Sequence, residues 1–339
     1  MNKIPVGVVG VGHLGKIHAT LYRQIDTADL IGVYDSDNEK AQRISAELNV
    51  RAFNSYQELL DNVKAVNIVT PTSTHFAMAR QALNQNCHLF IEKPIMATEE
   101  EAVQIIDQAQ QKNKKIQVGH IERFNPAVLA MSDVPLKPIF IESHRLASFN
   151  PRGTDVAVIL DLMIHDLDLI LSLVKSNPLQ IDASGVGVIS NTVDIANARI
   201  QFESGCVANI TASRISNKKM RKMRIFQQNS YISVDFMEGF SEIYYIDDAT
   251  SASFQDGTLA FSLGQIDAGN IRKDIKYNKL QRSDINPLKY ELSGFIDSLQ
   301  NDVPVLVSAE EGLAALRLAN QVLLKIAEHA QRVAQGSEN

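Results

Sequence analysis

The chain has 339 residues, of which 45% are hydrophobic and 21% are charged, and its formal net charge is −6. This length exceeds the size at which one hydrophobic core usually keeps growing, so we expect two domains. The acidic balance argues against a nucleic-acid or membrane-surface binder. Cys87 and Cys206 are too few and too far apart for a disulfide framework or a zinc site. We therefore expect a protein of the reducing cytoplasm, with no nucleic-acid or membrane partner and no metal.

The N-terminus follows the order strand, glycine turn, helix, strand, acid. A short apolar run leads directly into Gly10-Val11-Gly12-His13-Leu14-Gly15, after which apolar residues recur at helical spacing. Gly10 permits a tight turn, Gly12 lets a pyrophosphate approach the backbone, and Gly15 lets the helix pack close to the strand. A second apolar run ends in Asp35, whose carboxylate can accept both ribose hydroxyls and would repel a 2′-phosphate. This order predicts a site for NAD.

The elements that follow change character near residue 120. Before it, apolar runs alternate with amphipathic segments, a pattern typical of a doubly wound parallel sheet; the runs lie near residues 5–9, 30–34, 65–69, 88–91 and 115–119. After it, one helix is expected around 161–173, then alternating strands with a hairpin turn within 201–207, then helices at 287–299 and 308–332. We therefore expect an α/β Rossmann domain over residues 1–120. An α+β domain with an open, mainly antiparallel sheet is expected over 121–339.

Glu92-Lys93-Pro94 follows the buried run 88–91, which places Glu92 and Lys93 at the carboxyl end of a strand. Open α/β sheets bind their ligands at that edge, so Lys93 is a candidate for hydride chemistry. The alternative is an ordinary lysine in a loop between strand and helix.

Asp161 and His165 are four residues apart in an apolar segment, hence on one face of a helix. The carboxylate can orient the imidazole, and histidine titrates nearest neutrality, so His165 is a candidate to accept a hydroxyl proton. The alternative is a structural histidine with a helical partner. No further cluster of histidine or cysteine accompanies these residues, and hydride transfer to NAD needs no metal.

Several of these motifs occur together in one known family. The glycine loop, Asp35, Thr70-Pro71-Thr72-Ser73-Thr74-His75, Glu92-Lys93-Pro94 and the spacing of Asp161 to His165 follow in order. In this the chain resembles the glucose-fructose oxidoreductase, inositol dehydrogenase and MocA-like family over essentially its whole length. The resemblance implies that Lys93 and His165 form the catalytic pair, supported by Asp161, with His165 as the base, and that the open sheet forms a homodimer or homotetramer. The residues expected at the cofactor are Gly10, Gly12, His13, Leu14, Gly15, Asp35, Thr70, Pro71, Thr72, His75, Glu92 and Lys93.

Residues 118–126 and 161–168 resemble a narrower branch, the UDP-N-acetylglucosamine 3-dehydrogenases and related nucleotide-sugar oxidoreductases. Six basic side chains within 214–224 can hold a diphosphate, although alternate residues of a strand can also simply face solvent. The residues expected at the substrate are Lys93, Arg123, Asn125, Arg152, Asp161 and His165, while Arg123, Asn125, Arg145 and Arg152 can equally be structural. The best interpretation is an NAD-dependent dehydrogenase of UDP-N-acetylglucosamine that yields a 3-keto nucleotide sugar. The alternatives are a dehydrogenase of free sugar or inositol and a noncatalytic NAD-binding regulator.

Overall fold

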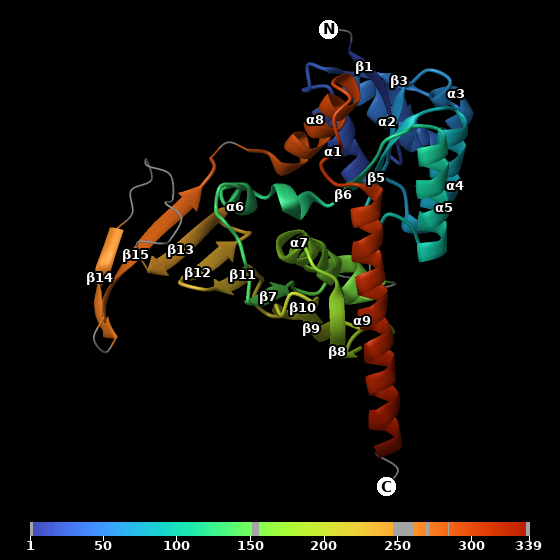
Figure 1. Ribbon diagram of the computed structural model, residues 1–339. Coiled ribbons are helices and arrows are strands. Elements are labelled where there is room, and N and C mark those ends of the chain that lie inside the picture. Colours follow the sequence, from blue (N-terminus) through green and yellow to red (C-terminus); the bar gives the residue numbers. More distant parts are fainter. Residues whose placement is uncertain (1–2, 151–155, 247–260, 269–270, 284, 337–339) are drawn as a thin grey trace. The chain divides into compact units, whose positions relative to one another are not determined.

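A computed structural model describes residues 3–150, 156–246, 261–268, 271–283 and 285–336 (Figure 1). The chain divides into two compact units, Met1–Ile121 with Ile285–Arg317, and Glu122–Asp284 with Leu318–Asn339. This division differs from a single cut after residue 120 because a C-terminal segment returns to the first unit. Its helix buries an apolar face in the core of that unit, through Leu288, Leu292, Phe295 and Ile296.

A parallel sheet forms the centre of the first unit. Within the described residues it has six strands in the order β3-β2-β1-β4-β5-β6, and the order reverses between β1 and β4, which confirms the predicted doubly wound sheet. The two-residue strand β3 escapes prediction because it is too short to show a period. The strands are β1 (Ile4–Val9), β2 (Ala28–Tyr34), β3 (Arg51–Ala52), β4 (Ala65–Ile68), β5 (His88–Glu92) and β6 (Ile116–Gly119).

Helices cover both faces of this sheet (Figure 1). On one face, Val6 and Val8 of β1 pack in a core cluster with Tyr22 and Phe295. Gly7 points to the other face, where a Cβ would lie 2.8 Å from the side chain of Leu59. The first face carries α1 (His13–Tyr22), α2 (Asn38–Leu48) and α8 (Pro287–Gln300), and the second carries α3 (Tyr56–Leu60), α4 (Thr72–Asn84) and α5 (Glu99–Gln111).

The second unit is built on a mixed sheet. In the part of the chain that the structure describes it has nine strands, in the order β14-β15-β13-β12-β11-β7-β10-β9-β8. Only β7 and β10 pair in parallel among these strands, which confirms a mainly antiparallel sheet. The predicted hairpin is the turn between β9 and β10. The strands are β7 (Phe140–Leu146), β8 (Pro178–Val186), β9 (Ile195–Phe202), β10 (Val207–Ser213), β11 (Met220–Gln227), β12 (Ser230–Asp235), β13 (Phe240–Ile246), β14 (Phe261–Ala268) and β15 (Ile271–Gln281).

The two faces of this sheet differ in what they carry. Buried residues alternate with half-buried ones along β7, and the buried side packs against a helical layer. That layer comprises a 3-10 turn (Ile121–Phe124), α6 (Pro126–Leu129), a π-helical turn (Ile159–Met163) and α7 (Ile164–Val174). On the opposite side a row of half-buried rings crosses five strands at centroid distances of 5.0 to 5.6 Å; it consists of Phe140, Phe226, Tyr231, Tyr244 and Tyr277.

The final helix, α9 (Ala309–Gly336), begins in the first unit and ends in the second. Ser308 supplies the predicted capping signature: its hydroxyl accepts from the N–H of Glu311, and Glu311 Oε2 accepts from the N–H of Ser308. Among the described helices, none combines the length and the hydropathy that a membrane span requires.

Candidate active site

The three glycines of the N-terminal loop have distinct tasks. Gly10 has φ +81°, in the left-handed region that favours glycine, and a Cβ there would lie 2.6 Å from the carbonyl oxygen of Val69. A Cβ on Gly15 would lie 1.8 Å from the carbonyl oxygen of Gly10. Next to Gly12, in contrast, no atom lies within 4 Å of an added Cβ. Gly12 is also the N-cap of α1, so open space adjoins a helix N-terminus, as a pyrophosphate requires.

Asp35 lies directly after β2 and contacts this loop. Its Oδ2 accepts a hydrogen bond from the N–H of Val11 at 2.8 Å, and its Oδ1 accepts from the N–H of Asp37 at 3.0 Å. The ammonium of Lys40 lies 3.6 Å from Oδ1. Because a carboxylate oxygen can accept two hydrogen bonds, each oxygen keeps capacity for one ribose hydroxyl. The residues of this half of the site therefore fit NAD.

The Thr70 to His75 segment forms the start of α4, with Thr70, Pro71 and Thr72 at or near the surface. His75 is buried, and both its ring nitrogens face backbone carbonyls. Nε2 lies 2.9 Å from the oxygen of Thr70, and Nδ1 lies 3.1 Å from that of Pro94 and 3.3 Å from that of Ile95. Burial lowers the pKa of His75, although the carbonyl contacts oppose this. Through these contacts the ring of His75 joins the backbone of Thr70 to that of Pro94 and Ile95.

Glu92 and Lys93 lie at the carboxyl end of β5, as the sequence predicts. Glu92 Oε1 lies 3.2 Å from Nε2 of His18, and Glu92 Oε2 accepts the N–H of Lys93 at 3.2 Å. His18 Nδ1 in turn lies 2.8 Å from the amide nitrogen of Asn67. Sequence reasoning did not identify His18 or Asn67. The only available signal was a histidine three residues after Gly15 on the apolar side of the helix.

Asp161 and His165 lie in the second unit, at the junction of two helical forms. Asp161 belongs to the π-helical turn, and His165 is the second residue of α7. This corrects the expectation of one regular α-helix. The hydrogen bonds of α and π turns span about four and five residues respectively, so residues four apart, such as Asp161 and His165, still lie on the same side of the helix. Both are half-buried. π turns are frequent at functional sites.

A hollow of about 670 Å³ opens beside Asp161 in the second unit. Its wall combines polar, cationic and apolar groups, including Asn150, Asp161, Lys219, Arg221, Phe236 and Met237. Sequence reasoning missed Phe236 and Met237, because apolar residues after a strand give no signal of a ligand site. The mixture of cations with an apolar wall is suited to an anionic organic ligand.

The basic segment 214–224 does not act as one cluster. Arg214 is buried, donates to the carbonyl oxygen of Val156, and lies 3.7 Å from Asp194. Lys222 pairs with Asp235 at 3.0 Å, and Arg224 pairs with Glu142 at 3.5 Å. Both lie on the side of β11 that carries the row of rings.

Arg221 lies on the other side of β11, opposite Arg145 in the register. Its side chain is 49% exposed and lies 3.8 Å from Glu122. Arg221 and the exposed Lys219 line the hollow. Strand alternation therefore divides the predicted diphosphate cluster between two faces.

The remaining predicted substrate contacts have protein partners. Arg123 makes a bidentate pair with Asp168, at 2.8 and 2.7 Å. Asn125 caps α6 and donates to the carbonyl oxygen of Phe236 at 3.0 Å. These contacts favour the structural interpretation that the sequence left open. Arg152 lies outside the described residues.

Arg145 is also a structural residue, since its guanidinium is buried between Asp166 and Glu122. The distances are 2.6 Å from Nε to Asp166 and 3.0 Å from Nη1 to Glu122. Burial alone would lower the pKa of Arg145, but the two carboxylates raise it above its ordinary value. Asp166 also accepts from the Ser143 hydroxyl at 2.8 Å. This network fixes β7 to α7, the helix that carries His165.

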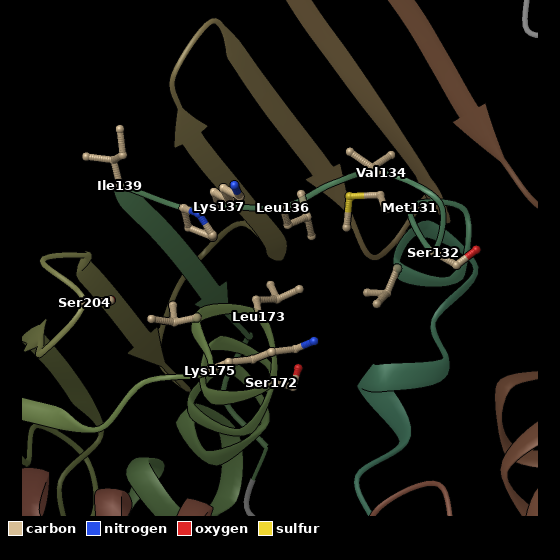
Figure 2. Close-up of a pocket in the computed structure, with 13 residues that line it drawn as sticks. Met131, Ser132, Val134, Leu136, Lys137, Ile139, Ser172, Leu173, Lys175 and Ser204 are labelled. Atoms are coloured by element: carbon tan, nitrogen blue, oxygen red, sulfur yellow. The ribbon is translucent and has the colours of Figure 1, made fainter. Parts of the chain in front are cut away.

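A second hollow of about 600 Å³ lies elsewhere in the same unit (Figure 2). Figure 2 shows Met131 and Leu136, from the segment before β7, across from Leu173 near the end of α7. The lining is largely apolar and contains none of the predicted site residues. The hollow beside Asp161 is therefore the candidate site in this unit.

Known proteins are similar to this chain in both units. A family model described as "Oxidoreductase family, NAD-binding Rossmann fold" matches residues 4–120, and one described as "GFO/IDH/MocA C-terminal domain" matches residues 141–232. UDP-N-acetylglucosamine 3-dehydrogenase from Acidithiobacillus ferrooxidans is 44% identical over 246 residues, which cover 72% of this chain and 78% of that protein.

Two further relatives extend the comparison. A solved structure of UDP-N-acetylglucosamine 3-dehydrogenase GnnA from Acidithiobacillus ferrooxidans superposes with a TM-score of 0.86 and 37% identity, covering 96% of this chain and 98% of that chain. A scyllo-inositol 2-dehydrogenase from Bacillus subtilis is 29% identical over 237 residues, which cover 63% of this chain and 68% of that protein. The glycine loop, Asp35 and the two matched domains agree with one another: the chain belongs to the GFO/IDH/MocA family of NAD-binding oxidoreductases.

Proposed function

We propose that this protein oxidises the sugar 3-hydroxyl of UDP-N-acetylglucosamine to a 3-keto nucleotide sugar, with NAD as the cofactor. The observation that carries the proposal is the hollow in which Asp161 lies together with Lys219 and Arg221. A diphosphate needs cations, whereas a free sugar does not, and this protein is acidic overall. The relatives named as UDP-N-acetylglucosamine 3-dehydrogenases support the same substrate.

We assign the chemistry to Lys93 and His165, acting on one substrate hydroxyl. NAD, when bound, supplies the hydride acceptor. The imidazole of His165 takes the hydroxyl proton, since a neutral histidine is a base near neutral pH. The ammonium of Lys93 donates a hydrogen bond to the same oxygen and stabilises the negative charge that develops there. Asp161 orients His165 from the same side of the helix.

The cofactor contacts belong to the proposal as well. Backbone N–H groups of His13 and Leu14, at the start of α1, receive the pyrophosphate beside Gly12. Asp35 receives the ribose hydroxyls through the remaining acceptor capacity of its two oxygens. Thr70, Pro71 and Thr72 border the dinucleotide at the carboxyl end of β4. Arg123 and Asn125 act on the substrate site indirectly. Arg123 pairs with Asp168 of α7, and Asn125 caps α6 and donates to the carbonyl oxygen of Phe236, which lines the hollow.

We also propose a cytoplasmic homodimer or homotetramer. Cys87 and Cys206 are both free and buried, which suits a reducing compartment. The row of half-buried rings from Phe140 to Tyr277 lies on the side of the second sheet opposite the helical layer. Such an apolar row is suited to association between copies. Light scattering measures the assembly, and a monomer at all concentrations would contradict this part.

The experiment for the function mixes the purified protein with NAD and UDP-N-acetylglucosamine and follows NADH formation by absorbance. The product is analysed by mass spectrometry for the loss of two hydrogens and by NMR for a ketone at carbon 3. Inositol, glucose and other nucleotide sugars are assayed in parallel. Turnover of inositol or glucose without turnover of UDP-N-acetylglucosamine would favour the polyol dehydrogenase instead. Tight NAD binding without turnover of any sugar would favour the noncatalytic regulator.

A further inference from the structure

A buried histidine lies against the carboxylate of Glu92, the residue before Lys93. His18 lies on α1 and its side chain is 0% exposed, while the side chain of Glu92 is 13% exposed. Their atoms Nε2 and Oε1 lie 3.2 Å apart. On the far side of the ring, Nδ1 lies 2.8 Å from the amide nitrogen of Asn67, which is also fully buried. His18 therefore bridges the central strand β4 and the end of β5.

The partners of His18 determine where its ring carries a proton. An amide nitrogen can only donate, so Nδ1 accepts from Asn67 and the ring proton lies on Nε2, facing Glu92. The Nε2 atom and Glu92 Oε1 lie 3.2 Å apart without the alignment of a hydrogen bond, so the contact between the ring and the carboxylate is a close polar contact.

Glu92 is confined on its other sides too. Its Oε2 accepts the backbone N–H of Lys93 at 3.2 Å. A Cβ on Gly119 would lie 2.9 Å from Oε1, so the neighbouring strand β6 leaves room for this carboxylate only because it has a glycine there. Beyond Lys93, the ring of His75 faces the carbonyl oxygens of Pro94 and Ile95. Contacts from buried histidines thus flank Lys93 on both sides along the chain.

We propose that His18 is a positioning residue for Lys93, acting through the carboxylate of Glu92. The inference rests on the proposed catalytic role of Lys93. His18 is buried and does not touch the substrate; it fixes the Glu92 side chain, and that side chain fixes the backbone from which Lys93 extends. Because His18 lies on the helix that starts at the glycine loop, the element that binds the pyrophosphate also sets the position of the lysine. Small displacements of catalytic groups are costly to turnover.

Two substitutions of His18 separate positioning from simple core filling. The amide nitrogen of His18→Gln falls near the position of Nε2 and keeps an N–H group beside the carboxylate of Glu92. The shorter His18→Asn places its amide near Nδ1, facing Asn67, and removes the polar group that lies beside Glu92 Oε1. We expect His18→Asn to lower kcat about tenfold or more with little change in NAD affinity, and His18→Gln to stay within about threefold of the unmodified protein.

A second measurement does not depend on turnover. Hydrogen exchange of the Lys93 amide, resolved by mass spectrometry without substrate, reports the bond from this N–H to Glu92 Oε2. We expect exchange to be roughly tenfold faster in His18→Asn than in His18→Gln. Equal kcat and equal Lys93 exchange in the two variants, both folded, would overturn the proposal.

If His18→Asn does not fold, Gly119→Ala tests whether the position of the Glu92 carboxylate controls Lys93, because Gly119 contacts that carboxylate from strand β6. The added methyl displaces the carboxylate of Glu92 without altering His18, so kcat should fall and Lys93 exchange should rise. Unchanged values of both would overturn the proposal. If the unmodified protein turns over no sugar, the proposed function fails, and the exchange comparison still decides whether His18 fixes the segment around Lys93.

Discussion

The N–H of Val11 donates a hydrogen bond to Oδ2 of Asp35 at 2.8 Å, and this bond joins the glycine loop to the end of β2. The carboxylate that should select the cofactor is therefore held by the loop that should bind its pyrophosphate. The same pairing means that a substitution at Asp35 affects both cofactor choice and the order of the loop.

We expect Asp35→Ser to erode the preference for NAD over NADP by about tenfold or more, equivalent to about 1.4 kcal/mol. The serine removes the negative charge that repels a 2′-phosphate, and Lys40, 3.6 Å from Oδ1, remains to attract one. Calorimetric titration with both cofactors measures the change. Asp37→Ser is the matched control, because Asp37 caps α2 by accepting from Lys40 N and serine preserves that cap. Equal binding of NAD and NADP by the unmodified protein would refute the assignment of Asp35.

Lys93→Met and His165→Asn should lower turnover by on the order of a hundredfold or more, while folding and NAD binding stay nearly intact. Each change removes a group that acts on the reacting oxygen. Asp161→Asn should cost less, since the amide can still orient the imidazole. Steady-state kinetics, NAD titration and thermal unfolding are compared for each variant. Full activity in either of the first two would return that residue to a structural role.

Hydrophobic period and turn residues were sufficient to predict the doubly wound sheet and the hairpin between β9 and β10, because both patterns are local. The division of the basic segment was not predictable. Whether Arg221 and Lys222 share a ligand depends on the register of β11 against β7, which places Arg221 opposite Arg145 on the inner side of the sheet.

The role of His18 was hidden for a related reason. Its partners Asn67 and Glu92 are 49 and 74 residues away along the chain, and only the parallel order of β1, β4 and β5 brings them together. The π-helical turn at Asp161 likewise has no local sequence signal that separates it from an α-helix. Residues whose tasks depend on long-range pairing remain beyond sequence reasoning.

Gly12→Ala should lower NAD affinity, whereas Gly15→Ala should lower the stability of the fold. A methyl on Gly15 would lie 1.8 Å from the carbonyl oxygen of Gly10, so we expect a loss of about 1 to 3 kcal/mol or more in unfolding free energy. A methyl on Gly12 meets no protein atom within 4 Å, so stability should be nearly unchanged while NAD affinity falls. Denaturant unfolding and calorimetry separate the two effects. Normal NAD binding by Gly12→Ala would place the pyrophosphate elsewhere.

His88 should make the protein less stable in mild acid. Its pKa is lowered from 6.5 to about 4, first by burial and then by the charges of Lys114 and Lys115, and its Nδ1 accepts the N–H of Lys115 at 3.0 Å. Between pH 6.5 and about 4 the unfolded chain binds a proton that the folded chain does not. The free energy of unfolding should therefore fall as the pH is lowered across that window, by less than the limit of about 1.4 kcal/mol per pH unit, because the partly exposed ring is screened by solvent.

His88→Asn is the matched variant for this effect, because its amide oxygen can accept the same N–H without titrating. Urea unfolding between pH 4 and 7 should give a shallower dependence for the variant than for the unmodified protein. Identical slopes would remove His88 as the cause.

The two sides of β11 provide the sharpest test of the substrate site. One double variant, Lys219→Gln with Arg221→Gln, removes two cations from the wall of the hollow. The control, Lys222→Gln with Arg224→Gln, removes one lysine and one arginine from the opposite side of β11. There, Lys222 pairs with Asp235 and Arg224 with Glu142. We expect the first pair to weaken UDP-N-acetylglucosamine binding about tenfold or more, because a charge-assisted contact to phosphate is lost.

The second pair should leave substrate affinity unchanged, and neither pair should alter NAD affinity. Salt provides a further check, since Lys219 is exposed and the side chain of Arg221 is 49% exposed, so their attraction to a diphosphate is screened as ionic strength rises. The unmodified protein should therefore lose affinity for the nucleotide sugar with added salt more steeply than the Lys219 and Arg221 variant does. Equal salt dependence in all three proteins, or equal weakening by both double substitutions, would move the diphosphate away from this hollow and leave a neutral polyol as the better fit.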